Sequence, residues 1–220
     1  MATRSLSLLS ALVSFGAAAA EQLPSLPPPG APLHWSISTG ETVSPSSDAI
    51  ALALGWPGAR FDYLHGLSNS SDIGLRIELL YVEENTANSK FGFGIGAPVR
   101  LVVTRKDNLL LGVHLDPGLR VYTNSNLTDL FLRAPVGGIL GIQATAQLRL
   151  AVAADLNLAL QTQHGAFFEI GPSFGFGVDY LVDKSLMVGA NARFGPQWIT
   201  TTGTGADFAF TAEIVIGYRL

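Results

Sequence analysis

The last thirteen residues of the chain, 208–220, alternate strictly between two kinds of side chain. Apolar side chains occupy one set of positions: Phe208, Phe210, Ala212, Ile214, Ile216, Tyr218 and Leu220. The positions between them are mixed in character and include Glu213 and Arg219. Because successive side chains of a β-strand point to opposite faces, this pattern predicts a final strand with one apolar and one partly charged face.

The same alternation recurs along most of the chain. Apolar residues hold nearly every second position in residues 91–103, 109–121, 148–160, 168–180 and 186–194. Glycine or polar residues lie between them, and no segment shows the three-to-four-residue spacing of an amphipathic helix. The sequence therefore predicts an all-β fold.

Short polar segments divide the alternating runs into hairpins. Tight turns are expected at residues 68–72, 105–108, 144–147 and 183–185, and longer connections at 42–47, 84–89, 123–128, 162–165 and 200–206. The segments between them number about ten, the even number typical of bacterial barrels. The first of these strands would cover residues 33–40 and the second would include 49–63. Eight strands is the alternative if either segment is misread.

The final strand resembles the C-terminal signature of bacterial outer-membrane proteins, in which apolar residues alternate and an aromatic residue stands third from the end. Tyr218 fits that place, whereas Leu220 replaces the usual terminal phenylalanine. The chain is thus similar to small bacterial outer-membrane β-barrel proteins of the OmpA-like and porin-like superfamily. This resemblance implies a monomeric, transmembrane, antiparallel up-and-down β-barrel with short periplasmic turns. It also implies contact with outer-membrane lipids and lipopolysaccharide, and recognition by the barrel-assembly machinery through the C-terminal strand.

The beginning of the chain indicates export. Arg4, a short apolar core and four alanines, Ala17 to Ala20, read as a cleavable signal peptide over residues 1–20. Its apolar stretch is shorter than the roughly 20 residues that a transmembrane helix needs. Residues 21–32 are rich in proline and read as an extended periplasmic lead, which leaves residues 33–220 for the barrel. The chain has no cysteine, so disulfides cannot stabilise the exported protein.

Alternation alone does not say which face of the barrel points outward, since a soluble exported barrel of the lipocalin kind alternates as well. Two observations favour a membrane barrel. Only 14% of the residues are charged, too few to coat a soluble exterior. Aromatic residues also gather near the predicted strand ends, where interfacial girdles lie in membrane barrels: Trp35, Trp56, Tyr81, Phe91, Tyr122, Phe131, Trp198, Phe208 and Tyr218.

The mixed faces would then line the lumen. The predicted lumen network consists of Arg76, Glu78, Arg100, His114, Asp116, Arg120, Arg149, Asp155, Glu169, Asp179, Arg193, Glu213 and Arg219. The signs are balanced, so these groups are expected to pair in a structural network that closes a narrow lumen. The alternative is a small polar pore whose charged lining sets ion preference.

Other functions find less support in the sequence. The outer loops, 124–126 and 200–205, could bind lipopolysaccharide or a host surface, which makes an adhesion protein the alternative from a different class. Of the four histidines only His164 is expected at the outer rim, without an evident catalytic partner, so an enzyme is not expected. No metal-ligand spacing or cofactor motif occurs, and no basic patch suggests nucleic acid. The sequence therefore predicts a structural or narrow pore-forming barrel of the bacterial outer membrane.

Overall fold

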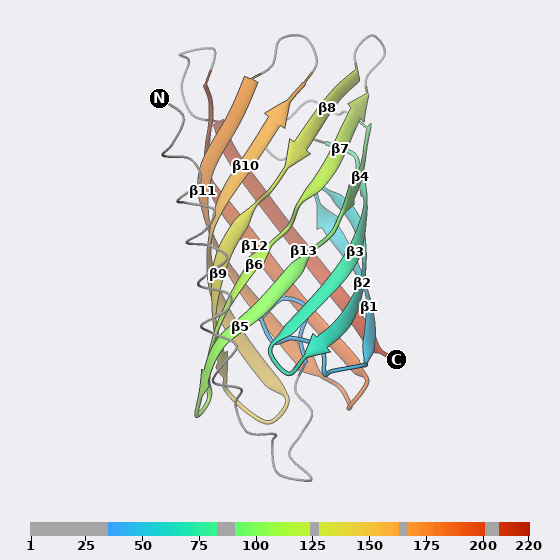
Figure 1. The fold of residues 1–220 in the computed structure, drawn as a ribbon, viewed down its shortest axis with the longest axis vertical. Helices are drawn as coiled ribbons and strands as arrows, with labels where there is room; N and C mark the ends of the chain where they lie inside the picture. Colours follow the sequence, from blue (N-terminus) through green and yellow to red (C-terminus); the bar gives the residue numbers. More distant parts are fainter. Residues whose placement is uncertain (1–34, 83–90, 124–127, 163–166, 201–206) are drawn as a thin grey trace, which may run out of the picture. The chain divides into compact units, whose positions relative to one another are not determined.

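The computed structural model describes residues 35–82, 91–123, 128–162, 167–200 and 207–220, and these form β-strands joined by turns (Figure 1). None of these residues belongs to a helix that could cross a membrane. The strands are β1 (Asp48–Trp56), β2 (Gly58–Ser68), β3 (Ser71–Leu80), β4 (Phe91–Gly96), β5 (Val99–Lys106), β6 (Leu109–Leu115), β7 (Gly118–Thr123), β8 (Thr128–Arg133), β9 (Val136–Gln143), β10 (Leu148–Gln161), β11 (Phe167–Leu181), β12 (Leu186–Ile199) and β13 (Asp207–Arg219).

The strands close into a barrel because the last one pairs with the first. β13 and β1 are antiparallel, with Ala49 opposite Arg219 and Leu52 opposite Ile216. Three passes through the wall are each split in two at a proline: β4 and β5 at Pro98, β6 and β7 at Pro117, and β8 and β9 at Pro135. Proline has no amide hydrogen to donate to the ladder, and the ladder is interrupted at these three prolines, whereas β11 and β12 continue through Pro172 and Pro196. The result is the predicted antiparallel up-and-down barrel of about ten passes.

The two ends of the barrel differ in their connections. We call the end where β1 begins and β13 finishes the proximal end, and the opposite end the distal end. The turns that join β2 to β3, β5 to β6, β9 to β10 and β11 to β12 lie at the proximal end and span few residues, as the sequence predicts. The spaces inside the corresponding halves of the barrel are the proximal lumen and the distal lumen.

The predicted number of passes is right although two strand assignments are wrong. Residues 48–68 form not one strand but the hairpin of β1 and β2, which turns at Trp56 and Pro57. Residues 35–40, expected as part of the first strand, form no strand at all. Both sides of β1 are already paired, with β13 and with β2, so the wall offers no edge where residues 35–40 could join.

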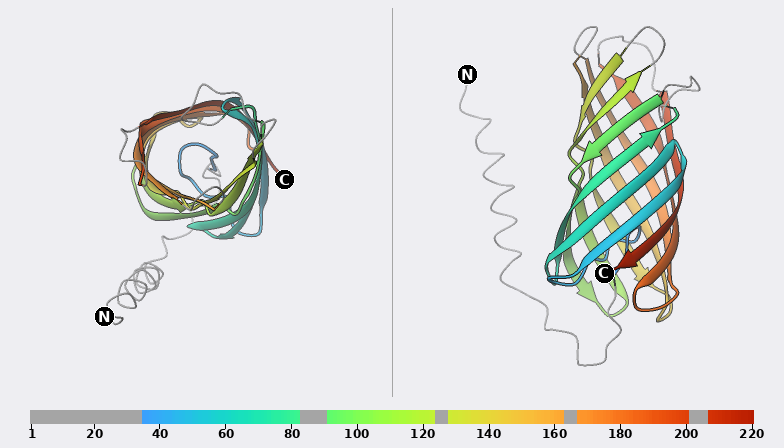
Figure 2. Two further views of the ribbon diagram at one scale, coloured as in Figure 1. Left: turned by 90° about the horizontal axis from the view of Figure 1, so that it is seen from above. Right: turned by 90° about the vertical axis from the view of Figure 1, so that its right-hand side faces the viewer.

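Residues 35–47, which we call the inner segment, instead lie within the ring of strands. In the left view of Figure 2 the blue chain that begins at Trp35 runs inside the barrel wall. The side chains of Trp35 and Val43 are fully buried, against a cluster of inward-facing apolar residues from the proximal wall: Ala49, Ala51, Ala53, Leu64, Leu181, Met187 and Val215. The longer connection expected at residues 42–47 therefore does not join two strands of the wall and lies at the proximal end, together with the short turns.

The outer face of the barrel is apolar along the whole length of the strands. Side chains such as Leu54, Phe176 and Ile214 are more than half exposed, and large exposed apolar residues occur on every pass. Within the described residues, the exposed charged side chains all lie at strand ends or in turns: Lys106, Asp107, Asp183, Lys184 and Asp207. Charge in the middle of the strands is confined to the inner face.

Candidate functional site

The structure places the side chains of the predicted lumen network on the inner face of the wall. Those that are buried are Arg100, His114, Arg120, Arg149, Asp155, Glu169 and Asp179. A cavity in the distal lumen is lined by Arg76, Glu78, Asp116, Arg193 and Glu213, among others. Arg219 lies on the same face of β13 as the buried residues Val215 and Gly217. These residues fall into two groups, one in each half of the lumen.

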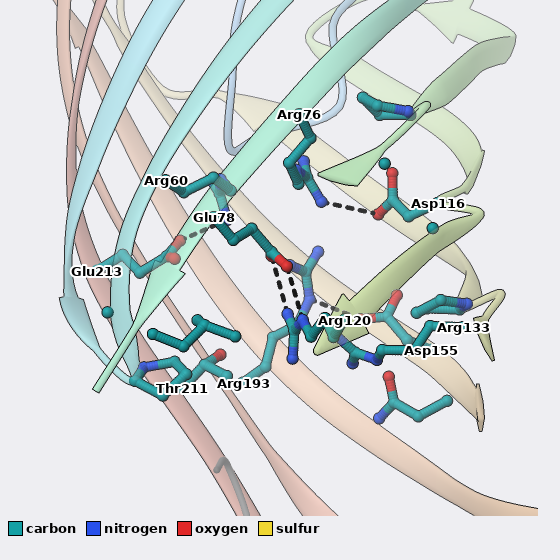
Figure 3. A pocket seen from close by; sticks show the side chains of 18 of the residues that line it. Arg60, Arg76, Glu78, Asp116, Arg120, Arg133, Asp155, Arg193, Thr211 and Glu213 are labelled. Atoms are coloured by element: carbon teal, nitrogen blue, oxygen red, sulfur yellow. Dashed lines mark hydrogen bonds and ion pairs between the residues drawn. The ribbon is translucent and has the colours of Figure 1, made fainter. Parts of the chain in front are cut away.

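Eight ionisable side chains form a continuous series of contacts around the distal lumen, which we call the charge ring. Figure 3 labels all members of the ring except Asp62 and His114. The contacts of the ring alternate in sign and connect Glu213, Arg60, Asp62, Arg76, Asp116, His114, Asp155 and Arg193 in that order. The separations are, in the same order, 2.6, 2.8, 2.7, 3.5, 3.2, 2.8 and 2.5 Å. Arg60 and Asp62, which the alternation of residues 49–63 also predicts to face inward, lie on the same face of one strand.

Glycines on the intervening strands let the charged side chains meet. In the strand register, His114 of β6 and Asp155 of β10 lie on either side of Gly137. A Cβ atom added to Gly137 would lie 2.7 Å from His114 Nε2 and would collide with the Asp155 carboxylate. Glu78 and Arg120 meet across Gly94 in the same way, with Arg120 Nε donating to Glu78 Oε2 at 2.6 Å. The glycine-rich faces are thus shaped to the ion pairs that cross them.

The proximal lumen is organised differently, because its polar wall residues bind the inner segment. Asp179 of β11 accepts hydrogen bonds from the Ser38 amide, at 3.0 Å, and from the Thr39 hydroxyl, at 3.1 Å. Asp72 of β3 accepts from the Val43 amide at 2.8 Å. These carboxylates therefore bind the segment largely through its backbone.

Arg100 links the wall to the segment and also supports Asp72. Its guanidinium donates to both Asp72 oxygens, at 2.9 and 2.6 Å, and to the Ser36 carbonyl at 2.8 Å. The Asp72 and Arg100 side chains are 0% and 10% exposed. A pair so deeply buried requires hydrogen bonds to its remaining lone pairs and protons, and the segment backbone provides them.

Glu41 is the inner segment's only charged residue, and two arginines of the wall bind it. Arg105 contacts Glu41 Oε1 through Nε, at 3.1 Å, and through Nη2. Arg149 Nη1 donates to the other oxygen, Oε2, at 3.1 Å. The Glu41 side chain is 7% exposed, so its charge is neutralised almost entirely by these two guanidinium groups.

Small residues in the proximal wall make room for the segment backbone. A Cβ atom at Gly177 would lie 2.9 Å from the Ser38 carbonyl oxygen, and one at Gly141 would lie 2.7 Å from that of Thr39. Gly217 faces the Trp35 ring, where a Cβ atom would lie 3.1 Å from the ring edge. The absence of a side chain at Gly177 thus permits one particular contact, with the backbone of the inner segment.

The sequence missed the residues that hold the segment, namely Trp35, Glu41, Asp72 and Arg105. Trp35 and Tyr122, assigned to the aromatic girdles, are instead buried inside the barrel. Several expectations lie outside the described residues: the signal peptide 1–20, the proline-rich lead 21–32, His34, His164, and the loop residues 124–126 and 201–205. Within the described ranges no group of three or more His, Asp or Glu could hold a metal ion.

The sequence matches no protein-family model and no curated protein. The functional argument therefore depends on the barrel, its two faces and its lumen.

Proposed function

We propose that this protein is an integral outer-membrane β-barrel whose narrow lumen is lined by the charge ring in its distal half and closed by the inner segment in its proximal half. The observation that carries the proposal is the distribution of polarity across the wall. Apolar side chains cover the outer face of every pass, and charged side chains in mid-strand point inward. Hydrocarbon tolerates such a surface, whereas monomeric soluble proteins rarely expose a continuous apolar patch of more than a few hundred Å².

A soluble exported barrel would show the reverse arrangement. Barrels of the lipocalin kind are polar outside and enclose an apolar ligand cavity. Here the distal cavity is lined by five arginines, Arg60, Arg76, Arg120, Arg133 and Arg193, together with the carboxylates that pair with them. An outward apolar band around a polar interior is the pattern of transmembrane barrels.

Aromatic residues at both ends fit the interfaces of a bilayer, where their rings lie at the headgroup level. At the distal end, the rings of Trp56 and Tyr81 meet edge to face with centroids 5.7 Å apart, and Trp198 is 43% exposed. At the proximal end, Tyr180 and Tyr218 are nearly half exposed. Two aromatic belts support the membrane assignment even without Trp35 and Tyr122.

The orientation follows from the connections. Bacterial barrels have short turns on the periplasmic side and longer loops outside. The short turns and the end of β13 lie at the proximal end, which we therefore assign to the periplasm. A signal peptide at residues 1–20 would deliver the chain to that compartment, and the C-terminal strand would be available there to the assembly machinery.

Ile216→Arg and Thr211→Arg form a matched pair of variants that tests this proposal. Ile216 is 53% exposed on the outer face, whereas Thr211 lines the distal cavity from the same strand. An arginine on the lipid face costs about 2–4 kcal/mol near the bilayer midplane. We expect Ile216→Arg to lower the folded, heat-modifiable fraction in vesicles, and Thr211→Arg to lower it less. Equal tolerance, or no heat-modifiable form of the unaltered protein, would refute the membrane assignment.

A further inference from the structure

We infer that Arg105 and Arg149 form an anion-binding site in the proximal lumen, and that Glu41 occupies this site as a built-in carboxylate. The inner segment is then a displaceable stopper, and the path that it closes prefers anions. This inference rests on the proposed membrane barrel and specifies what its lumen conducts.

The site has the geometry of carboxylate recognition. Each oxygen of Glu41 is bound by a different guanidinium, Oε1 by Arg105 and Oε2 by Arg149. Both arginines are held independently of Glu41, because Arg105 also donates to the Asn69 carbonyl at 2.7 Å and Arg149 contacts Gln143 Oε1 at 3.4 Å. Wall groups thus keep the two guanidinium groups in place if Glu41 leaves, so a small anion could replace its carboxylate.

The charge of the wall also favours anions. Among the wall residues that the structure describes, Arg100, Arg105, Arg149 and Arg219 face inward at the proximal end, against two carboxylates, Asp72 and Asp179. Arg219 Nη1 is buried and makes no hydrogen bond with the described residues. The inner segment brings one compensating charge, that of Glu41. Without the segment this end of the lumen would carry an excess of positive charge, which concentrates anions and excludes cations.

The segment is attached in a way that permits removal. It belongs to no strand of the sheet. Its backbone pairs with the wall at its last residues, next to β1, where the Ser46 amide donates to the Gly66 carbonyl and the Gly66 amide donates to the Ser47 carbonyl, both at 2.9 Å. The polar contacts of residues 35–44 with the wall are hydrogen bonds that involve side chains and the Glu41 ion pairs. A cavity bordered by Thr39, Glu41, Arg105 and Arg149 reaches the site from the proximal rim. Loss of the Glu41 charge removes the attraction to both arginines without any change in the wall.

Reversal potentials in planar bilayers under a potassium chloride gradient test the inference. The variants are Glu41→Gln, Glu41→Gln combined with Arg149→Gln, and Asp183→Asn, which removes one carboxylate from an exposed turn of the same rim outside the cavity. We expect Glu41→Gln to conduct more often than the unaltered protein, with a reversal potential shifted toward that of chloride. Asp183→Asn should match the unaltered protein, and the added Arg149→Gln should reduce the chloride preference severalfold.

A cysteine pair tests displacement of the segment separately. A Cβ atom at Gly177 would lie 3.5 Å from Ser38 Cβ, within the range that a disulfide spans, and the natural chain has no cysteine. Because the same Cβ atom would lie 2.9 Å from the Ser38 carbonyl oxygen, Gly177→Cys alone in the Glu41→Gln background is the control for displacement by the new side chain itself. Oxidised Ser38→Cys/Gly177→Cys protein, in the Glu41→Gln background, should not conduct, and reduction should restore the chloride-selective current.

The outcomes separate the two proposals. Vesicle flotation and heat-modifiable mobility establish insertion before any current is recorded. Inserted protein that never conducts, that prefers potassium after Glu41→Gln, or that conducts equally with the disulfide closed overturns the anion path and leaves the membrane barrel standing. Protein that fails to insert refutes both.

Discussion

The two halves of the lumen use the same types of charged side chain, arginines and carboxylates, for different purposes. In the distal lumen, arginines and carboxylates of the wall pair with each other, as in the contacts of Arg60 and Arg76 with Asp62. In the proximal lumen, Asp179 and Arg149 bind a separate stretch of chain. Charged residues facing inward therefore say little about function until their partners are known. Pairs within the wall brace the barrel, and pairs with the inner segment hold something that can leave.

The two halves of the lumen also differ in the apolar residues of their inner face. The inward side chains of Ala49, Ala51 and Val215 are almost completely buried because Trp35 and Val43 pack near them. Among the described residues no such segment enters the distal cavity, and arginines and carboxylates line it instead. In this barrel the apolar patch on the inner face thus marks the place where the inner segment packs.

Asp72→Ala should have the largest effect, because Asp72 serves both the wall and the segment. Its loss would leave the buried Arg100 without a counter-charge and the Val43 amide without an acceptor. Breaking a buried pair from one side costs about 3–5 kcal/mol. Urea unfolding in vesicles measures this loss. Asp207→Ala, an exposed carboxylate at the distal end, should change the free energy of unfolding by less than about 0.5 kcal/mol.

Trp35→Ala should release the inner segment and leave the wall closed. Truncation of a fully buried tryptophan costs about 3–5 kcal/mol, and here the loss falls on the segment alone. A protease that cleaves after glutamate should then cut at Glu41 while the heat-modifiable form persists. Trp198→Ala, which removes the same ring from the outer face, should leave Glu41 protected. If Trp35→Ala abolished the folded form, the contrast between wall and segment would fail.

Gly137→Ala should disturb the charge ring by a smaller amount. Its methyl group would push apart His114 and Asp155, and overpacking of this kind costs about 1–3 kcal/mol. The next residue provides the control, because a Cβ atom at Gly138 meets only the Gly112 carbonyl, at 3.8 Å. Urea unfolding should therefore distinguish Gly137→Ala from Gly138→Ala, and equal midpoints would mean that the ring does not brace the distal wall.

The barrel was predictable from the sequence because period-two alternation is a local property of each strand. The ends of the strands were less predictable. Gly55, Pro57 and Gly58 mark the turn between β1 and β2, but apolar residues alternate on both sides of this turn and obscure it. For residues 35–40 the pattern was misleading. Trp35, Ile37 and Thr39 alternate with serines and glycine as a strand would, yet their environment is set by distant wall residues.

The contacts within the lumen depend on register, which alternation does not determine. Ser38 and Asp179 are 141 positions apart in the chain, and Arg149 and Glu41 are 108 apart. The alternation could assign Asp179 and Arg149 to the inner face but not name their partners. One sign that residues 35–47 are unusual was present in the sequence: Glu41 is the single charged residue in this stretch.

Quenching of single tryptophans by brominated acyl chains tests the central claim, that apolar side chains face lipid while the inner segment lies in the lumen. The chain has three tryptophans, so Trp56→Phe with Trp198→Phe leaves Trp35 alone. Replacing Trp35 as well and adding Phe176→Trp, at a position 60% exposed in mid-strand, gives the outward probe. The account predicts strong quenching of the tryptophan at position 176 and little at Trp35. Equal quenching, or stronger quenching of Trp35, would contradict it.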